Sequence, residues 1–288
     1  MKHILVHLHV YYHDQIDYFI QKLKNINGVE WDLVVTFSQK DATTERKLKE
    51  FKPDVRFLQV ENFGYDVWPF IKLIKETDLT AYDYVIKLHT KRWIERCRPN
   101  IILLEGYDWR NALVDGILYN ESHFKRVLNK FESNPEVGMI SSLLTNVSRD
   151  YYHEEVKEEL KRLDMKKKDK YICMGTMFMM RSKVLQPLKS ELISESLFRD
   201  EHPRSGTYFQ TAHLYERVLS HLPINTGFKK VTVSPLKRDY YKIKLNKFFE
   251  PLGKFFFSCE REGFNRDKVV RIFMIKIYQK SDGRQSEY

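Results

Sequence analysis

The chain has 288 residues, of which 42% are hydrophobic and 14% aromatic, and its formal net charge is +10. That length allows one large domain with an appendage, and the apolar fraction excludes disorder for most of the chain, because disordered segments are poor in hydrophobic and aromatic residues. Cys97, Cys173 and Cys259 lie far apart, which excludes a disulfide-rich scaffold and favours reduced thiols. Residues 1–10 lack the features of a signal peptide, and no run reaches the roughly 20 apolar residues of a membrane span, so we expect a cytoplasmic protein.

Strand and helix patterns alternate along the first part of the chain. Apolar, β-branched runs predict strands that are buried on both faces, and segments with helical spacing lie between them. This alternation is typical of right-handed βαβ units, so we predict an α/β fold with a mainly parallel central sheet. In chain order, the sequence predicts strands at 2–10, 31–37, 55–60 and 82–88, which alternate with helices at 18–26, 43–51 and 68–77. The later elements are a helix at 109–129, a short strand at 137–141, a charged helix and loop at 151–170, an apolar segment at 172–181 and a helix at 207–222.

Basic residues concentrate near the C-terminus. Residues 229–288 hold 15 Lys and Arg against 7 Asp and Glu, so most of the net charge lies there. We therefore predict a domain at 1–228 and a basic, aromatic-rich extension at 229–288. Such a mixture suits an anionic membrane surface, and a solvated surface or a nucleic-acid-binding segment has the same composition. The residues concerned are Lys237, Arg238, Lys242, Lys244, Lys247 and Lys254, which flank Phe248, Phe249 and Phe255 to Phe257.

Polar side chains gather at the carboxyl ends of the predicted strands, where an open parallel sheet binds its ligands. His7 and His9 end the first strand, and polar segments follow the second, third and fourth strands. His3 would share a strand face with His7 and His9, but no carboxylate or thiol is adjacent in sequence, so we predict no metal site there. The convergence on one edge is stronger evidence than any single motif.

The segment after the third predicted strand contains Asn62, Gly64 and Asp66. Gly64 permits the backbone to approach a ligand closely or to turn with a positive φ. Asp66 precedes Pro69, which suits the first turn of a helix, so a carboxylate that only caps this helix is the alternative interpretation. We favour a role for the three residues in binding a ligand.

The fourth predicted strand ends in Lys87, His89, Thr90, Lys91 and Arg92. Several cations at a strand end can hold a diphosphate through charge-assisted hydrogen bonds, and a histidine can donate to a phosphate or a sugar hydroxyl. A basic loop in solvent is the alternative interpretation. We favour binding, because an apolar strand runs directly into these polar residues.

Two later segments supply further candidates. Gly175 and Thr176 would line a pocket beneath a sugar, whereas the methionines around them are predicted to pack in the core. His213 and Glu216 are three residues apart and share one face of a predicted helix. They resemble an acid/base unit, and a structural histidine beside a Glu216–Arg217 surface ion pair is the alternative.

Four motifs in order resemble the rhamnan synthesis protein F family: N-x-G-Y-D-x-x-P-F, Y-D-Y-V-I-K-L-H-T-K-R, G-T-M-F-M-x-R and H-L-Y-E-R. The resemblance extends from about Val6 to Leu222. That family contains bacterial glycosyltransferases of surface-polysaccharide assembly, including rhamnosyl and galactofuranosyl transferases. The resemblance implies a GT-A-like nucleotide-binding fold.

The resemblance also implies a reaction. A sugar, rhamnose or galactofuranose, would move from a UDP or dTDP donor to a glycan or lipid-linked glycan in one inverting displacement. Glu216 is the first candidate for the base, Asp66 the second and His213 the third. Asn62, Gly64 and Asp66 would contact the ribose or the donor sugar. Lys87, His89, Lys91 and Arg92 would face the diphosphate.

Many GT-A enzymes carry an Asp-x-Asp metal motif near the place where this chain has Leu88, His89 and Thr90. Mn²⁺ or Mg²⁺ is therefore possible but not expected, since cationic side chains can neutralise the leaving group. The resemblance implies an acceptor at the inner face of the plasma membrane, where the protein would be peripheral. The alternatives are a non-catalytic carbohydrate-binding or assembly subunit and, less favoured, a nucleic-acid-binding protein.

Overall fold

The computed structural model describes residues 2–97, 104–147, 153–199, 210–245, 257–262, 267–272 and 275–280. Contacts divide the described residues into two units, of which the first ends at residue 235 and the second comprises those from 236 onward. The first unit contains the predicted candidate site, so it is described first and by itself.

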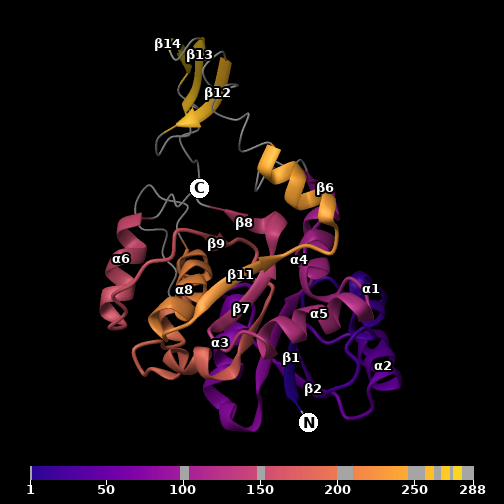
Figure 1. Ribbon diagram of the computed structural model, residues 1–288. Coiled ribbons are helices and arrows are strands. Elements are labelled where there is room, and N and C mark those ends of the chain that lie inside the picture. Colours follow the sequence, from indigo (N-terminus) through magenta and orange to yellow (C-terminus); the bar gives the residue numbers. More distant parts are fainter. Residues whose placement is uncertain are drawn as a thin grey trace. The chain divides into compact units, whose positions relative to one another are not determined.

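A seven-stranded sheet forms the centre of the first unit (Figure 1). β10 runs antiparallel to both of its neighbours, and the other neighbouring pairs are parallel, which confirms the predicted α/β fold with a mainly parallel sheet. From edge to edge the strands are β11 (Lys229–Val233), β7 (Val137–Ser142), β10 (Phe178–Arg181), β4 (Tyr84–His89), β1 (His3–Val10), β2 (Glu30–Phe37) and β3 (Arg56–Gln59).

Helices cover both faces of this sheet and bury a hydrophobic cluster on each (Figure 1). One face is covered by α1 (Ile16–Leu23), α2 (Ala42–Phe51), α4 (Asp108–Leu118) and α5 (Glu121–Glu132). The other face is covered by α3 (Val67–Glu76), α6 (His153–Arg162), α7 (Ser196–Arg199), α8 (Thr211–Asn225) and the 3-10 segment η4 (Ser182–Lys189). The short elements are η1 (His13–Gln15), η2 (Leu79–Ala81), η3 (Leu143–Thr145), β5 (Ile94–Cys97), β6 (Leu104–Gly106), β8 (Asn146–Val147) and β9 (Ile172–Cys173).

Three details differ from the sequence-based expectation. The helix predicted at 109–129 is two helices, because the Asn120 side chain accepts a hydrogen bond from the His123 N–H at 2.8 Å and begins α5. The hairpin of β5 and β6 was not predicted. Residues 229–233 pair in parallel with β7 and extend the sheet, so by contacts the first unit continues past the predicted boundary at 228.

The two faces of β1 differ in character along the strand. Ile4, Val6 and Leu8 contribute to the cluster beneath α1 and α4, whereas Leu5 contributes to the cluster beneath α3. Because side chains alternate along a strand, His7 and His9 lie on the same face as Leu5. On the α3 face of β1, the buried Leu5 therefore lies between the partly buried His3 at the amino end and two buried histidines at the carboxyl end.

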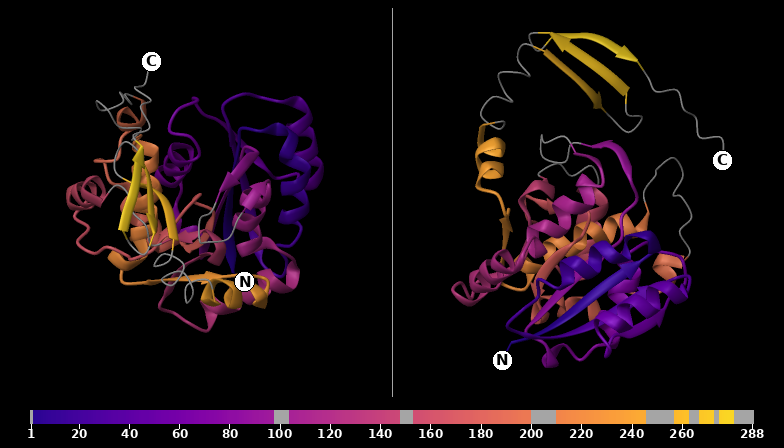
Figure 2. Two further views of the ribbon diagram at one scale, coloured as in Figure 1. Left: turned by 90° about the horizontal axis from the view of Figure 1, so that it is seen from above. Right: turned by 90° about the vertical axis from the view of Figure 1, so that its right-hand side faces the viewer.

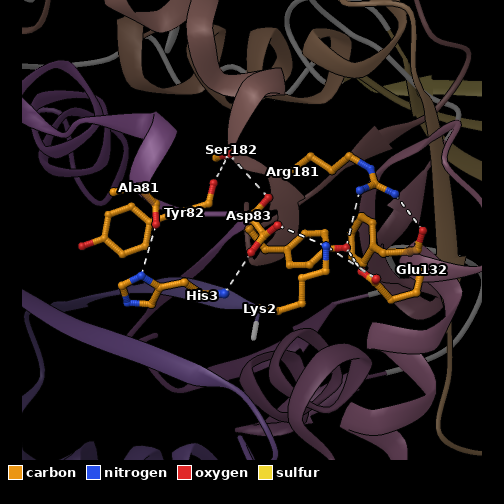
Figure 3. Close-up of polar contacts among 10 residues, drawn as sticks. Lys2, His3, Ala81, Tyr82, Asp83, Glu132, Arg181 and Ser182 are labelled. Carbon is orange, nitrogen blue, oxygen red and sulfur yellow. Dashed lines mark hydrogen bonds and ion pairs between the residues drawn. The ribbon is translucent and has the colours of Figure 1, made fainter.

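Polar contacts hold the amino ends of β1 and β4 (Figure 3). The Asp83 carboxylate accepts hydrogen bonds from Lys2 Nζ at 3.2 Å and from the His3 N–H at 3.0 Å. Arg181 donates to the carbonyl oxygens of Val137 and Phe131 at 2.8 and 2.7 Å. We call this set of contacts the amino-end clasp.

The second unit contains a helical segment at 237–245 and an antiparallel three-stranded sheet (Figure 2). The strands are β12 (Phe257–Glu262), β13 (Asp267–Ile272) and β14 (Ile275–Lys280). Lys247, Phe248, Phe249, Lys254, Phe255 and Phe256 of the predicted membrane-binding set lie outside the described residues. Within the described ranges, no helix has the length and apolar character to cross a membrane.

Candidate functional site

A cluster of three buried side chains and one that is 17% exposed, Asp66, lies at the carboxyl end of β4. Lys87 Nζ forms an ion pair with Asp66 Oδ2 and donates to Thr176 Oγ1 at 2.9 Å. Thr176 Oγ1 donates in turn to Asp66 Oδ2 at 2.8 Å. His89 Nδ1 lies 2.6 Å from the same carboxylate oxygen. We call Asp66, Lys87, His89 and Thr176 the carboxyl-end cluster.

The carboxyl-end cluster lies where the connections of the sheet change direction. β1 pairs with β2 on one side and with β4 on the other, so the chain leaves β1 toward one edge and later returns to its opposite side. In the β1–β4 register, His7 is opposite Lys87 and His9 is opposite His89. An open α/β sheet binds ligands in the crevice outside such a switch point.

Burial and charge set the ionisation of the carboxyl-end cluster. The side chains of Lys87 and Asp66 are 0% and 17% exposed. Burial would raise the pKa of Asp66, but its neighbours His89 and Lys87 hold it well below its usual range. Burial lowers the pKa of Lys87, and Asp66 acts in the opposite direction. The cluster therefore contains a buried carboxylate whose partner is a buried ammonium group.

Three histidines on this face are neutral at physiological pH. Burial lowers the pKa of His89 to about 3 and that of His9 to about 4, and it lowers the pKa of His7 well below its usual range. His7 Nε2 and His9 Nδ1 are 2.8 and 2.9 Å from the Thr36 hydroxyl oxygen. Within the described part of the chain, His89 Nε2 and His7 Nδ1 have no hydrogen-bond partner. Buried polar atoms without partners are uncommon, and a ligand can satisfy them.

Two left-handed turns position the side chains of the carboxyl-end cluster. Gly64 and Tyr65 have φ of 66° and 49°, and Gly175 and Thr176 have φ of 79° and 46°. Such values are unusual for Tyr and rarer for a β-branched residue such as Thr, and backbone strain of this kind concentrates at functional sites. A Cβ atom at Gly64 would lie 2.5 Å from the Trp68 Cβ, so no side chain fits there.

Asp66 precedes α3 but makes no side-chain capping bond to it. Its Oδ2 atom instead accepts hydrogen bonds from Lys87 and Thr176. The alternative interpretation of Asp66 as a helix cap is therefore wrong. The same residue pattern in sequence fits both arrangements, and only the direction of the side chain distinguishes them.

α8 brings His213 and Glu216 to the turn that bears Thr176. Glu216 Oε1 accepts a hydrogen bond from the Gly175 N–H at 2.7 Å, and its Oε2 lies 3.6 Å from Arg217 Nη1. The His213 ring centroid is 5.7 Å from that of Tyr65. Burial lowers the pKa of His213. A carboxylate and a neutral imidazole therefore lie beside the carboxyl-end cluster.

The other predicted site residues have different surroundings. The buried Thr90 hydroxyl accepts hydrogen bonds from the N–H groups of Tyr11 and Tyr12 at 2.9 and 3.0 Å, which ties the exit of β1 to that of β4. Lys91 is half-buried, Arg92 and Asn62 are exposed, and no ion-pair partner for either cation is found among the described residues. Lys91 lies close enough to Asp66 to lower the pKa of that carboxyl group, and the exposed Arg92 follows it in the chain.

Gln15 is a contributor that sequence reasoning missed. Its side chain donates to the Lys91 carbonyl oxygen at 2.7 Å and accepts from the Lys91 N–H at 3.2 Å. These two bonds fix the main chain of Lys91 and so the origin of its side chain. Nothing in the sequence around Gln15 signals this role, because its partner is far away in the chain.

The donor set does not favour a divalent metal. In the described residues, no three His, Cys, Asp or Glu side chains gather in a group that could hold one. Asp66 is the carboxylate of the carboxyl-end cluster, and the oxygen that faces the cluster already accepts from an ammonium group. Divalent cations such as Mg²⁺ take several oxygen ligands.

Comparison with known proteins gives one match to a family and several weak matches to solved structures. The rhamnan synthesis protein F family matches residues 1–228. No curated protein matches the chain. S. aureus TarS 1–349 is 9% identical with a TM-score of 0.42, and 84% of this chain aligns with 63% of that one. The mannosyltransferase PcManGT from Pyrobaculum calidifontis, in complex with GDP-Man and Mn²⁺, is 12% identical with a TM-score of 0.38, and 85% of this chain aligns with 60% of that one. The chain thus spans less than two thirds of either structure.

Proposed function

Because the chain belongs to the rhamnan synthesis protein F family, we propose that it is a glycosyltransferase that moves a sugar from a nucleotide donor to a surface glycan. The proposed sugar is rhamnose or galactofuranose, carried by dTDP or UDP, and the proposed acceptor is a glycan or a lipid-linked glycan. The observation that carries the proposal is the carboxyl-end cluster at the switch point of the sheet, with Lys91 close to its carboxylate and Arg92 next in the chain. A GT-A-like arrangement is part of the same proposal.

The proposed reaction is one inverting displacement. The acceptor oxygen loses its proton to a base and forms a bond to the anomeric carbon, while the bond from that carbon to the diphosphate oxygen breaks. The nucleoside diphosphate leaves with the electron pair. Lys91 and Arg92 would neutralise the leaving group, because both are without an ion-pair partner in the described residues, whereas Lys87 is occupied by Asp66 and Thr176.

The remaining predicted residues have proposed roles around the donor. Asn62, Gly64 and the turn at Gly175–Thr176 would contact the ribose or the donor sugar. His89 would bind a donor hydroxyl through its unpartnered Nε2. Asp66 is held as an anion with a depressed pKa, so it is a weak base and better suited to orient its neighbours.

Glu216 remains the first candidate for the base, and two variants separate this role from a structural one. Glu216→Gln keeps an oxygen that can accept the Gly175 N–H but cannot take a proton. Glu216→Ala removes both functions. Loss of turnover in both variants, with donor binding kept in Glu216→Gln, supports the base. Near-normal turnover in Glu216→Gln would contradict it and transfer the role to His213.

The direct test of the function is release of nucleoside diphosphate. The protein is incubated with dTDP-rhamnose, UDP-galactofuranose or GDP-mannose and a rhamnose oligosaccharide, with and without EDTA, and the products are separated by chromatography. We expect release from the dTDP or UDP donor, and we expect it to persist in EDTA because cationic side chains replace the metal. Failure with every donor, in protein that melts normally, would favour the non-catalytic carbohydrate-binding subunit.

The helical segment at 237–245 supports a second part of the proposal, the binding of an anionic membrane surface. It exposes four cations together with Tyr241, which is 72% exposed. Each cation near an anionic surface contributes about 1 kcal/mol. The cations are Lys237, Arg238, Lys242 and Lys244. Flotation with phosphatidylglycerol vesicles should fall when all four are replaced by Ser. Equal flotation of that variant would contradict the idea, and salt-dependent binding to DNA would indicate nucleic acid instead.

A further inference from the structure

Exposed aromatic side chains gather at the same edge of the sheet as the carboxyl-end cluster. In the first unit, the aromatic side chains with large exposure among the described residues are Tyr11, Tyr65, Trp93 and Tyr119. Tyr11 directly follows β1, Tyr65 directly precedes Asp66, and Trp93 lies in the segment that leaves β4. Three of the four therefore lie at carboxyl ends of strands, around the candidate site.

Each of these three residues has a neighbour that limits its movement, and the Tyr65 ring lies 5.7 Å from the His213 ring. The Tyr11 N–H donates to Thr90 Oγ1 at 2.9 Å, and its ring packs edge-on against Tyr12 with 4.9 Å between the centroids. Tyr65 has a φ of 49°, in the left-handed region. A Cβ atom added at Gly106 would lie 3.2 Å from Trp93 Nε1, so a glycine is needed where the hairpin passes the indole. Fixed aromatic rings lose little conformational entropy when a ligand binds.

Exposed aromatic rings on an otherwise polar edge point to a ligand with apolar faces and a polar rim. A sugar ring has this character, with C–H groups on its faces and hydroxyl groups around it. A glycan of several sugars offers one such ring after another, so it can contact side chains that extend from three different loops.

We propose that Tyr11, Tyr65 and Trp93 form the acceptor-binding platform, which stacks successive sugar rings of a growing glycan. This inference rests on the proposed transferase function and adds the residues that would bind the acceptor glycan. Trp93 is 59% exposed and offers the largest ring face of the three. Tyr65 neighbours both Asp66 and the ring of His213, so it would hold the sugar that carries the reacting hydroxyl.

The experiment compares acceptor binding in single alanine variants. Affinity for a rhamnose mono-, tri- and hexasaccharide is measured by calorimetry on the full chain with UDP or dTDP present. In the wild type, affinity should rise with the length of the acceptor. Trp93→Ala and Tyr65→Ala should each weaken hexasaccharide binding about tenfold, as expected for loss of one stacked ring. Tyr119→Ala is the matched control and should change nothing.

Two further measurements distinguish a defect in acceptor binding from a defect in folding or in donor binding. The melting temperature without ligand checks the fold of each variant, and UDP or dTDP affinity without acceptor checks the donor site. Loss of nucleotide affinity in Trp93→Ala would overturn the proposal, because the ring would then stack on the base. Equal hexasaccharide affinity in all variants would also overturn it. Because saccharide binding is measured directly, the platform can be confirmed even if no sugar transfer is found.

Discussion

The two ends of the same central strands are built in opposite ways. At the amino end, Lys2 and Asp83 are 40% and 37% exposed, and both oxygens of the carboxylate have partners. At the carboxyl end, Lys87 and Asp66 are withdrawn from solvent, and the neighbouring His89 has an imidazole nitrogen without a partner among the described residues. Half-exposed pairs contribute little to stability, whereas a buried charge needs its partner. The contacts at the amino end thus hold the strands together, and the carboxyl end has the properties of a ligand-binding site.

The largest effect should follow the loss of the anion at the carboxyl end. Asp66→Asn leaves the Lys87 ammonium buried without a counter-charge, so we expect the free energy of unfolding to fall by about 3–5 kcal/mol, and turnover to be lost. Urea denaturation measures this. The double variant Asp66→Asn with Lys87→Met should regain much of the stability and none of the activity. If Asp66→Asn lowers the free energy of unfolding by less than about 1 kcal/mol, the ion pair at the carboxyl end contributes no more to stability than the pair at the amino end.

The pH dependence should be dominated by the carboxyl end. The pKa values of His9 and His89 are lowered to about 4 and about 3, so below the unfolded pKa of about 6.5 the unfolded state binds more protons than the folded state. Stability therefore falls as pH drops below about 6.5, by on the order of 1 kcal/mol per pH unit for each such histidine. The depressed pKa of Asp66 acts in the same direction at lower pH.

Urea denaturation at several pH values between neutral and mildly acidic checks this expectation. His9→Asn should flatten the slope, because one group that titrates only on unfolding is gone. Gly28→Ala removes no titratable group, so it is the control and should leave the slope unchanged. A wild-type stability that is constant over this range would contradict the buried, neutral histidines.

A moderate effect is expected from the turn that positions Thr176. Gly175 has a φ of 79°, and a Cβ atom there would lie 2.8 Å from Leu113 Cδ1. Gly175→Ala should therefore lower stability by about 1–3 kcal/mol and reduce turnover by moving Thr176. Gly28→Ala is a matched control, since Gly28 has a similar φ of 76° but nothing within 4 Å of an added Cβ. If both variants lose the same stability and keep turnover, the close packing of the Gly175 turn has no role in the site.

The smallest effect should come from the amino-end clasp. Lys2→Ala removes two half-exposed ion pairs, to Asp83 at 3.2 Å and to Glu132 at 3.6 Å, so we expect a loss below about 1 kcal/mol and unchanged turnover. Chemical denaturation and the nucleotide-release assay measure the two quantities. A large loss of turnover would contradict the separation of roles between the two ends.

Local sequence patterns predict the elements of this fold better than the contacts of its site. The apolar run at 31–37 and the helical spacing at 68–77 each correspond to a single element, because burial dictates those patterns. The sequence did not predict that one helix ends before Asn120 and another begins after it, since the apolar periodicity continues through this residue. Residues 229–233 were assigned to the extension because their lysines obscured the strand pattern.

For the candidate site, the sequence predicts which residues meet and not how. Asp66, Lys87 and His89 were selected because strand ends converge, and Thr176 because its segment was predicted to line a pocket beneath a sugar. The structure brings these four together. Asp66 could have capped α3, but its carboxylate pairs with Lys87 instead. This difference depends on the left-handed turns at Tyr65 and Thr176. Neither residue type signals such a turn, so this part of the site could not be predicted.

The most direct test of the central claim is calorimetric titration with UDP, dTDP, GDP and CMP. The wild type is compared with the double variant Lys91→Ala and Arg92→Ala and with Lys166→Ala, which removes an exposed cation of another segment. The account predicts binding of UDP or dTDP that the double variant weakens at least about tenfold and Lys166→Ala leaves unchanged. Equal affinity of all three proteins for the nucleotide, or no binding of any nucleotide by the wild type, would contradict a diphosphate site at the carboxyl end of β4.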